Sequence, residues 1–213
     1  MNVAIFGANG RTGTLLTERC LAAGHHVSAL VREPSKFALR DRVRIVKGSI
    51  FDPVAVGDAI RNTEAVFSAL GAHSPFKKED VLERAVPVIV SRMEEHGPKR
   101  MIALGSAGAL ASSLDKQPAW RRWIVQTIVY NVFLKYPVES QIAQYRTLSG
   151  SGLDWTMVMP PMLTDGKGRG KYRIDGEALP RNGAQIARED VADFMVAQLG
   201  SSEWVRKGVY LSW

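Results

Sequence analysis

The sequence begins with a short apolar run that leads directly into a glycine-rich turn. Asn2–Phe6 (NVAIF) is followed by Gly7–Gly13 (GANGRTG), and in Arg11–Ala23 the apolar residues then recur at helical spacing. Glycines at G-x-x-G-x-x-G spacing let a backbone approach phosphates closely, and the N-terminus of the following helix offers unpaired N–H groups. This unit predicts a strand, turn and helix that bind the pyrophosphate of a dinucleotide; a purely structural glycine turn is the alternative.

Beyond this turn, short β-rich runs alternate with longer helical patterns. Strands are expected at Val27–Val31, Val43–Val46, Ala65–Ala69, Arg100–Leu104, Trp155–Met159 and Val209–Leu211. Helices are expected at Arg11–Ala23, from about Lys78 to His96 with Pro87 inside, and at Arg188–Leu199. This alternation predicts an α/β fold, a Rossmann-like doubly wound parallel sheet with helices on both faces.

Ligands of such sheets bind beyond the carboxyl ends of the strands, so the residues that follow each strand matter most. The length of 213 residues suits one domain. We expect residues 1–213 to form a single dinucleotide-binding domain in which the residues after about 160 make a small substrate-covering region. Pro160-Pro161 and the basic run Gly166–Lys171 (GKGRGK) have the composition of loops.

The end of the second strand indicates which dinucleotide is preferred. NAD-binding proteins commonly have an acidic residue there, which binds the ribose 2′-hydroxyl. Here the sequence is LVREPSK, with Arg32 as the first polar residue and Ser35 and Lys36 shortly after. Arg32 and Lys36 suit a 2′-phosphate, which arginine can bind through two hydrogen bonds. Glu33 opposes this interpretation, and a solvated basic loop is the alternative. We expect NADP(H) to be preferred over NAD(H).

Composition limits the possible partners. The chain has 28 Lys and Arg against 21 Asp and Glu, a formal net charge of +7 that favours anionic ligands. A single cysteine, Cys20, and four histidines without metal-binding spacing predict no metal. The apolar stretch Trp123–Leu134 is too short to span a bilayer. We expect a cytoplasmic protein with a small-molecule acceptor, no nucleic-acid partner and no membrane span.

The segment Pro118–Pro137, with Trp120, Trp123, Ile124, Ile128 and Phe133, is apolar on nearly every face from Trp123 onward. A helix of this kind must be buried or lie at an interface. Three interpretations remain open: a wall of the acceptor pocket, a homodimer surface, or a helix on a membrane surface that begins at Arg121-Arg122. The chain is therefore expected to be a monomer or a homodimer, with this segment as the candidate interface.

Several motifs, taken in order along the chain, resemble one known family. They are VAIF with GANGRTG, LVREPSK, GSIFD, SALGA, LGSAG and SGLDWTMVMPPMLTD. Together they resemble the atypical short-chain dehydrogenase/reductases that bind NAD(P), whose neighbours include the NmrA-like proteins. The MPP sequence, the length and the spacing are most similar to the branch of flavin reductase and biliverdin-IXβ reductase.

The resemblance implies roles for individual residues. It assigns the pyrophosphate to Gly7, Asn9, Gly10, Arg11, Thr12 and Gly13, the 2′-phosphate to Arg32, Ser35 and Lys36, the adenine to Ser49 and Ile50, the ribose and phosphates to Leu70, Gly71 and His73, and the nicotinamide to the backbone of Pro160, Pro161 and Met162. It also places Ser106 near the nicotinamide as the candidate catalytic residue, with capping of the strand end as the alternative. The sequence departs from the family at Ser49, where Asp is frequent, and at Gln141 and Met162, where His is frequent.

The Tyr-x-x-x-Lys pair of the standard short-chain dehydrogenases is not found. Four of the five tyrosines are followed four residues later by Leu134, Ser140, Ser149 or Gly176, and Tyr210 has only three residues after it. Without this proton-donating pair, oxidation of secondary alcohols is not expected. The reductase branch does not need the pair, because hydride passes directly to a stacked, electron-poor acceptor.

We therefore expect an NAD(P)H-dependent reductase that transfers hydride from NADPH to a planar acceptor. A flavin, as substrate rather than bound cofactor, is favoured over a quinone or a linear tetrapyrrole. The main alternative is a non-catalytic NmrA-like protein that binds NADP(H) as a sensor and regulates a partner. An epimerase or dehydratase that acts on a nucleotide-linked substrate is a third possibility, and the missing tyrosine–lysine pair counts against it.

Overall fold

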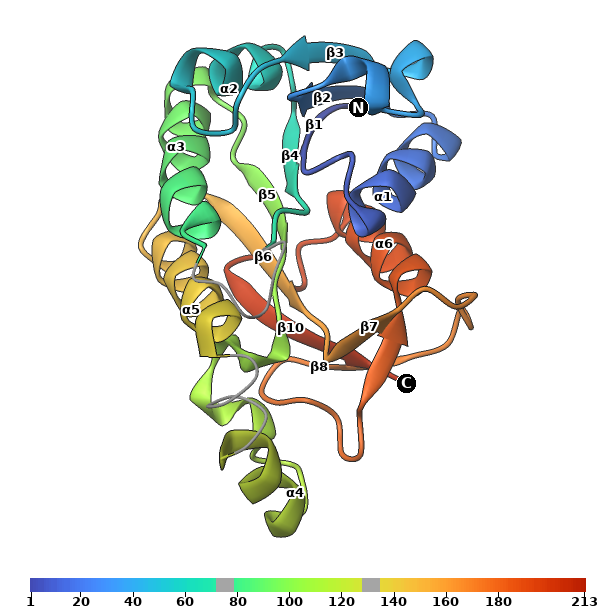
Figure 1. Cartoon of the computed structure of the whole chain (residues 1–213), viewed down its shortest axis with the longest axis vertical. Coiled ribbons are helices and arrows are strands. Elements are labelled where there is room, and N and C mark those ends of the chain that lie inside the picture. Colours follow the sequence, from blue (N-terminus) through green and yellow to red (C-terminus); the bar gives the residue numbers. More distant parts are fainter. Residues whose placement is uncertain (72–78, 128–134) are drawn as a thin grey trace.

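The structure, a computed structural model, describes residues 1–71, 79–127 and 135–213. Its main feature is an eight-stranded sheet in the order β3-β2-β1-β4-β5-β6-β10-β8 (Figure 1). In that order the strands are Arg44–Lys47, His26–Val31, Asn2–Phe6, Ala65–Ser68, Arg100–Leu104, Asp154–Met159, Lys207–Ser212 and Arg173–Asp175. Neighbours are parallel from β3 to β10, and β8 is antiparallel to β10. The expected Rossmann-like α/β fold is confirmed.

Helices cover both faces of the sheet (Figure 1). On one side lie α1 (Arg11–Ala22) and α6 (Arg188–Ala197), and on the other lie α2 (Pro53–Ile60), α3 (Val81–His96) and α5 (Lys135–Ser149). Two hydrophobic clusters fill the space between the layers. Successive side chains of a strand point to opposite faces, so in β1 Ala4 and Phe6 belong to one cluster while Val3 and Ile5 belong to the other. The central strands therefore read as continuous apolar runs.

Local sequence signals set where several helices begin and end. α2 begins after Asp52, whose side chain accepts a hydrogen bond of 2.9 Å from the Val54 N–H, and Pro53 occupies the first helical position. α3 ends at Gly97, which has φ of 100°, a conformation that suits glycine. The short helix α4 (Ala119–Ile124) lies apart from the layers, at the lower end of Figure 1.

The region after β6 builds a small second sheet. There β7 (Met162–Thr164) pairs in parallel with β9 (Gln185–Ala187), and β8 lies between them in sequence. Short 3-10 turns occur at Pro34–Lys36, Arg40–Arg42, Ala107–Ala109, Ala111–Leu114 and Gln198–Gly200. No helix of the described residues is long and apolar enough to cross a membrane.

Candidate dinucleotide site

A cavity of about 490 Å³ opens beyond the carboxyl ends of β1, β2, β3 and β4. This is the edge at which doubly wound sheets bind their ligands, and the volume is typical of a small-molecule site. The cavity is lined by residues from the glycine turn and from the ends of these strands: Gly7, Ala8, Asn9, Gly10, Arg11, Leu30, Val31, Arg32, Glu33, Lys36, Gly48, Ser49, Ile50, Phe51, Ala69, Leu70, Gly71 and Val81.

The glycine turn forms one wall and is shaped by close backbone approaches. Gly7 has φ of 81°, and its carbonyl accepts a hydrogen bond of 2.9 Å from the Gly10 N–H. A Cβ at Gly7 would lie 2.7 Å from the Ala69 carbonyl oxygen, and one at Gly13 would overlap the Gly7 carbonyl. α1 begins at Arg11 without a side-chain cap from Gly10. An open helix N-terminus beside a turn whose glycines let the backbone come close fits a pyrophosphate.

The end of β2 gives the cavity a wall of two cations and one carboxylate. Arg32, Glu33 and Lys36 all line it. The Lys36 Nζ and the Glu33 Oε2 are 2.7 Å apart in an exposed ion pair. Within the described part of the chain the Arg32 guanidinium has no hydrogen bond or ion pair. Arg32 is thus the cation on this wall whose donors are available to a ligand.

The ends of β3 and β4 form the opposite wall. The Ser49 hydroxyl accepts a hydrogen bond of 3.2 Å from the Phe51 N–H, which holds the turn after β3. The Arg84 guanidinium lies over the Phe51 ring, 4.3 Å from its centroid. A Cβ at Gly71, where the chain leaves β4, would meet no atom within 4 Å. This side of the cavity is therefore largely apolar and open.

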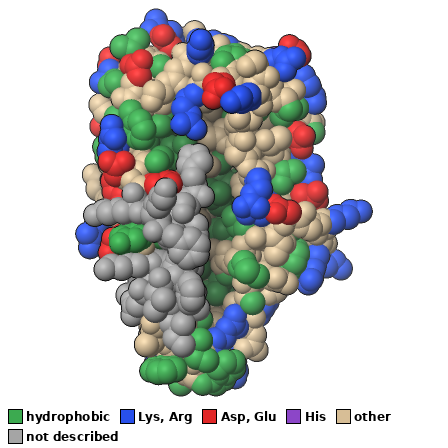
Figure 2. Space-filling view, viewed as in Figure 1, with side chains coloured by type: hydrophobic (Ala, Val, Ile, Leu, Met, Phe, Trp, Pro, Cys, Tyr) green, Lys and Arg blue, Asp and Glu red, His purple; other side chains and the backbone are tan. Residues whose placement is uncertain are grey.

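The structure places several of the expected residues outside the lining of the cavity. Thr12, Gly13 and Ser35 do not line the cavity; Thr12 and Gly13 are buried in the first turn of α1. His73 lies outside the described residues. Trp120 and Trp123, at the start of the apolar segment, do not line the cavity either and are 67% and 61% exposed. Figure 2 shows hydrophobic side chains gathered at the lower end of the molecule, where α4 lies.

The ends of β5 and β6, which carry Ser106 and Pro160–Met162, are joined to each other, and these expected site residues do not line the cavity. Ser106 follows β5, and its hydroxyl accepts a hydrogen bond of 3.4 Å from the Gly108 N–H. The Ala107 N–H donates to the Pro160 carbonyl at 2.9 Å, and the Met162 N–H donates to the Ala184 carbonyl at 3.2 Å. Since proline has no N–H, the only backbone donor of Pro160–Met162 already has an acceptor. To orient a ligand, this segment can therefore offer carbonyl oxygens but no free backbone N–H group.

Two polar arrangements near the site have no clear signal in the sequence. Arg11, on the glycine turn, donates to Asp165 at 2.9 Å, and Asp165 also accepts from Arg188 at 2.6 Å. Burial and the nearby Arg11 charge lower the pKa of the Arg188 guanidinium, while Asp165 opposes the shift. On the other face, the buried Gln144 amide donates to the Leu104 carbonyl and to the Gln141 side chain, both at 3.0 Å. Gln144 thereby fixes Gln141 near the end of β5.

The fold and this cavity together define an α/β protein of the dinucleotide-binding class. A family model described as NAD(P)H-binding matches residues 7–202, and the chain belongs to that family. The uncharacterized protein YwnB of Bacillus subtilis (strain 168) is 25% identical over 206 residues, which cover 95% of this chain and 92% of YwnB.

Solved structures share the fold over the whole chain. A short-chain dehydrogenase/reductase from Veillonella parvula DSM 2008, in complex with NADP, has a TM-score of 0.80 and 21% identity, and the match covers 100% of this chain and 94% of that one. ChuY, described as an anaerobilin reductase from Escherichia coli O157:H7, has a TM-score of 0.78 and 21% identity, with coverage of 100% and 97%. At these identities the likeness concerns the fold.

Proposed function

We propose that this protein is an NADPH-dependent reductase that transfers hydride to a planar acceptor, with a flavin as the favoured acceptor class. The observation that carries the proposal is the unpaired Arg32 guanidinium on the wall of a cavity built around the glycine turn. Family membership supports binding of NAD(P)H. The position of Arg32 supports preference for the form that carries a 2′-phosphate.

In this proposal the backbone of the glycine turn binds the pyrophosphate. Gly7, Asn9, Gly10 and Arg11 line the cavity, and the first turn of α1 adds the N–H groups of Thr12 and Gly13. Ile50 and Leu70, from opposite strand ends, pack against the adenine and its ribose. The Ser49 hydroxyl, which accepts a bond from Phe51, keeps its own hydrogen available for donation.

The 2′-phosphate is assigned to Arg32 first and to Lys36 second. Arg32 can present two parallel N–H donors to phosphate oxygens without breaking any contact of the described structure. Lys36 must share its charge with Glu33, since the pair is 2.7 Å apart. Ser35 does not line the cavity, so its contribution is restricted to the geometry of the 3-10 turn Pro34–Lys36.

The acceptor is proposed to lie beside Ser106 and the Pro160–Met162 segment, covered by the residues after about 160. When bound, the dinucleotide supplies the hydride. Carbonyl oxygens of the segment suit the amide N–H₂ of a nicotinamide, and the Ser106 hydroxyl can donate to the acceptor while it accepts from Gly108. The chain's contribution is then mainly to hold two flat rings in the reactive orientation and to exclude water.

A flavin-like acceptor fits the chain better than a tetrapyrrole. ChuY, which shares the fold, is described as an anaerobilin reductase. In this chain Gln141 and Met162 stand where the reductase branch often has histidines. Because the chain lacks these two histidines, an acceptor whose binding depends less on contacts between histidines and its acidic side chains is favoured.

The test is the rate of NADPH oxidation, followed by its near-ultraviolet absorbance, with and without free flavin and with NADH in parallel. We expect flavin-dependent oxidation that favours NADPH. Arg32→Gln should weaken NADPH binding by about tenfold or more and leave NADH binding nearly unchanged. Arg40→Gln is the matched control, because Arg40 lies in the same loop, carries the same charge and does not line the cavity.

The alternative is a non-catalytic sensor of NADP(H), as in the NmrA-like proteins. One observation favours it: the Met162 N–H and the Pro160 carbonyl are both engaged by other parts of the chain. If NADPH binds with an Arg32-dependent preference but neither flavin nor quinone accelerates its oxidation, the reductase proposal fails and the sensor replaces it. Equal loss of NADPH and NADH binding in Arg32→Gln would overturn the 2′-phosphate assignment.

A further inference from the structure

A second hollow, of about 430 Å³, lies beside the end of β10 and shares no residue with the dinucleotide cavity. It is lined by Arg169, Lys171, Tyr172, Arg173 and Trp213. Three of the five lining residues are cations, and the other two are aromatic. In Figure 2, Lys and Arg side chains project from the edge of the molecule where the chain between β7 and β8 lies.

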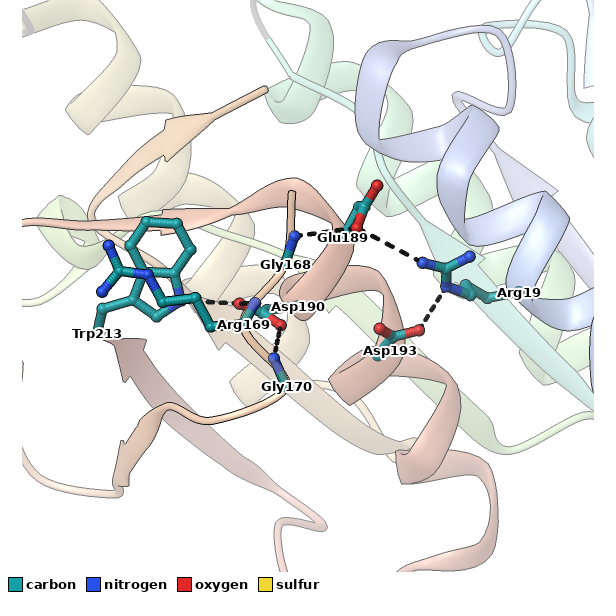
Figure 3. A network of polar contacts seen from close by, with 8 residues as sticks. All are labelled: Arg19, Gly168, Arg169, Gly170, Glu189, Asp190, Asp193 and Trp213. Carbon is teal, nitrogen blue, oxygen red and sulfur yellow. Dashed lines mark hydrogen bonds and ion pairs between the residues drawn. The ribbon is translucent and has the colours of Figure 1, made fainter. Parts of the chain in front are cut away.

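A buried carboxylate fixes the loop that carries two of these cations. Asp190, in the first turn of α6, is 1% exposed. Its side chain accepts hydrogen bonds from the Arg169 N–H at 3.0 Å, from the Gly170 N–H at 2.8 Å and from the Trp213 indole N–H at 2.7 Å (Figure 3). A Cβ at Gly168 would lie 2.8 Å from the Asp190 Oδ1. The glycines of GKGRGK therefore let the backbone wrap Asp190, while the Arg169 and Lys171 side chains line the hollow.

An aromatic ring and backbone oxygens hold two of these cations in place. The Arg169 guanidinium lies over the Trp213 ring, 3.7 Å from its centroid (Figure 3). Arg173 donates to the carbonyl oxygens of Arg181, at 2.6 Å, and of Trp213. Lys171 has no side-chain partner within the described ranges. These contacts hold the Arg169 and Arg173 side chains beside the hollow in the described structure.

The acidic side chains around the hollow make their contacts with groups other than its lining cations. Besides Asp190, Glu189 accepts from the Gly168 N–H at 3.0 Å and lies 3.9 Å from Arg19, and Arg19 also contacts Asp193 at 2.6 Å (Figure 3). Across the described residues, Arg169, Lys171 and Arg173 form no ion pair with an Asp or Glu side chain. The hollow thus combines three cations that no acidic side chain pairs with and two aromatic rings, a combination suited to a flat ring with an anionic group.

We propose that this hollow binds a small planar molecule that carries a phosphate group. Arg173 and Lys171 would bind the phosphate, and the Arg169–Trp213 stack, with Tyr172, would contact the ring. The proposal does not depend on the reductase assignment, because its residues and its test are separate from the dinucleotide cavity.

The test compares flavin mononucleotide with riboflavin, which has the same ring and lacks the phosphate. Both are titrated into the full-length chain in saturating NADP⁺, with binding followed by flavin fluorescence. We expect flavin mononucleotide to bind about tenfold more tightly, and the difference to shrink as salt is raised. Inorganic phosphate should compete with flavin mononucleotide and not with riboflavin. Lys171→Gln should remove most of the difference, and Arg173→Gln should do the same.

Lys167→Gln is the matched control, since Lys167 is exposed on the same loop and does not line the hollow. Lys171→Gln also guards against misfolding, because the Lys171 side chain makes no contact that the fold would lose. The proposal is overturned if the two flavins bind equally, if Lys171→Gln keeps the full difference, or if Lys167→Gln removes as much of it. Absence of flavin-dependent NADPH oxidation would instead count against the proposed function. It would leave the ratio of the affinities for flavin mononucleotide and riboflavin unaffected.

Discussion

The Arg11 guanidinium donates a hydrogen bond to the Asp165 carboxylate at 2.9 Å, which joins the glycine turn to the segment after β7. Both side chains are exposed, so the pair alone contributes little to stability. Its position matters more than its strength, because Arg11 lines the dinucleotide cavity. If Arg11 binds the pyrophosphate as proposed, the Asp165 carboxylate competes with it for the same cation.

Asp165→Asn is expected to raise the affinity for NADP(H) by a few fold, because the change removes a negative charge beside the phosphates and releases Arg11. Dissociation constants follow from the fluorescence of bound NADPH. The control is Asp193→Asn. Asp193 lies on α6 and pairs with Arg19 of α1, so this change removes an equal charge away from the cavity and should leave the affinity unchanged. An unchanged or lower affinity in Asp165→Asn would show that Arg11 does not serve the pyrophosphate.

Glu33→Gln should increase the preference for NADPH over NADH. The carboxylate pairs with Lys36 on the cavity wall, so its removal frees the ammonium and reduces repulsion of a 2′-phosphate. Affinities for both dinucleotides are measured in wild type, in Glu33→Gln and in Asp41→Asn, which removes the partner of Arg40 in the same loop. If Glu33→Gln weakens NADH and leaves NADPH unchanged, Glu33 binds the ribose hydroxyls instead.

Alanine should weaken dinucleotide binding at two glycines but lower the stability at only one of them. In Gly13→Ala the new Cβ would overlap the Gly7 carbonyl and lie 2.9 Å from the Ala8 Cα, so we expect a loss of roughly 1–3 kcal/mol in unfolding free energy together with lost binding. At Gly71 a Cβ meets open space on the cavity wall, so Gly71→Ala should keep its stability and lose affinity. Thermal unfolding measures the stability of each variant, and titration with NADPH measures its binding. A Gly13→Ala protein that is stable and still binds NADPH would contradict the described turn.

Burial raises the pKa of the Cys20 thiol from its ordinary value of 9.0 to about 12. The folded protein should therefore resist iodoacetamide at pH 8 to 9 and react only as it unfolds. The pKa of Cys20 is higher in the folded state than in the unfolded state. The contribution of the buried thiol to the unfolding free energy is therefore complete below pH 9 and is lost as the pH rises from 9 towards 12. In urea unfolding, the unfolding free energy should fall more between pH 8 and pH 10 in wild type than in Cys20→Ala. Equal losses would contradict this.

The sequence predicted the fold well where the signals are local. The glycine turn follows a strand that ends at Phe6, as expected, and Arg100–Leu104 has the predicted bounds. α3 begins at Val81 rather than near Lys78. Strand ends converge at one edge of a parallel sheet, so the wall made by Arg32 and Lys36 followed from topology alone.

Other elements depend on tertiary contacts and were not anticipated. α2 has Val, Gly and Ile in eight residues, a composition that strands also use, and only the Asp52-Pro53 cap indicates a helix. α5 contains Pro137 and polar residues on several faces, so its pattern is weak. The three-residue strands β7, β8 and β9 are too short for periodicity to show. The pairing of Arg11 with Asp165, which are 154 residues apart, has no local signal.

The buried Gln117 amide ties α4 to the chain between β8 and β9. Its nitrogen donates to the carbonyls of Leu179 and Pro180, and its oxygen accepts from the Asn182 N–H and from Arg121. All of these contacts meet on one side chain, so α4 and this loop must shift together. Replacement of the Gln117 side chain would therefore weaken the attachment of α4, with its exposed Trp120 and Trp123, to the loop whose Arg181 carbonyl accepts from Arg173.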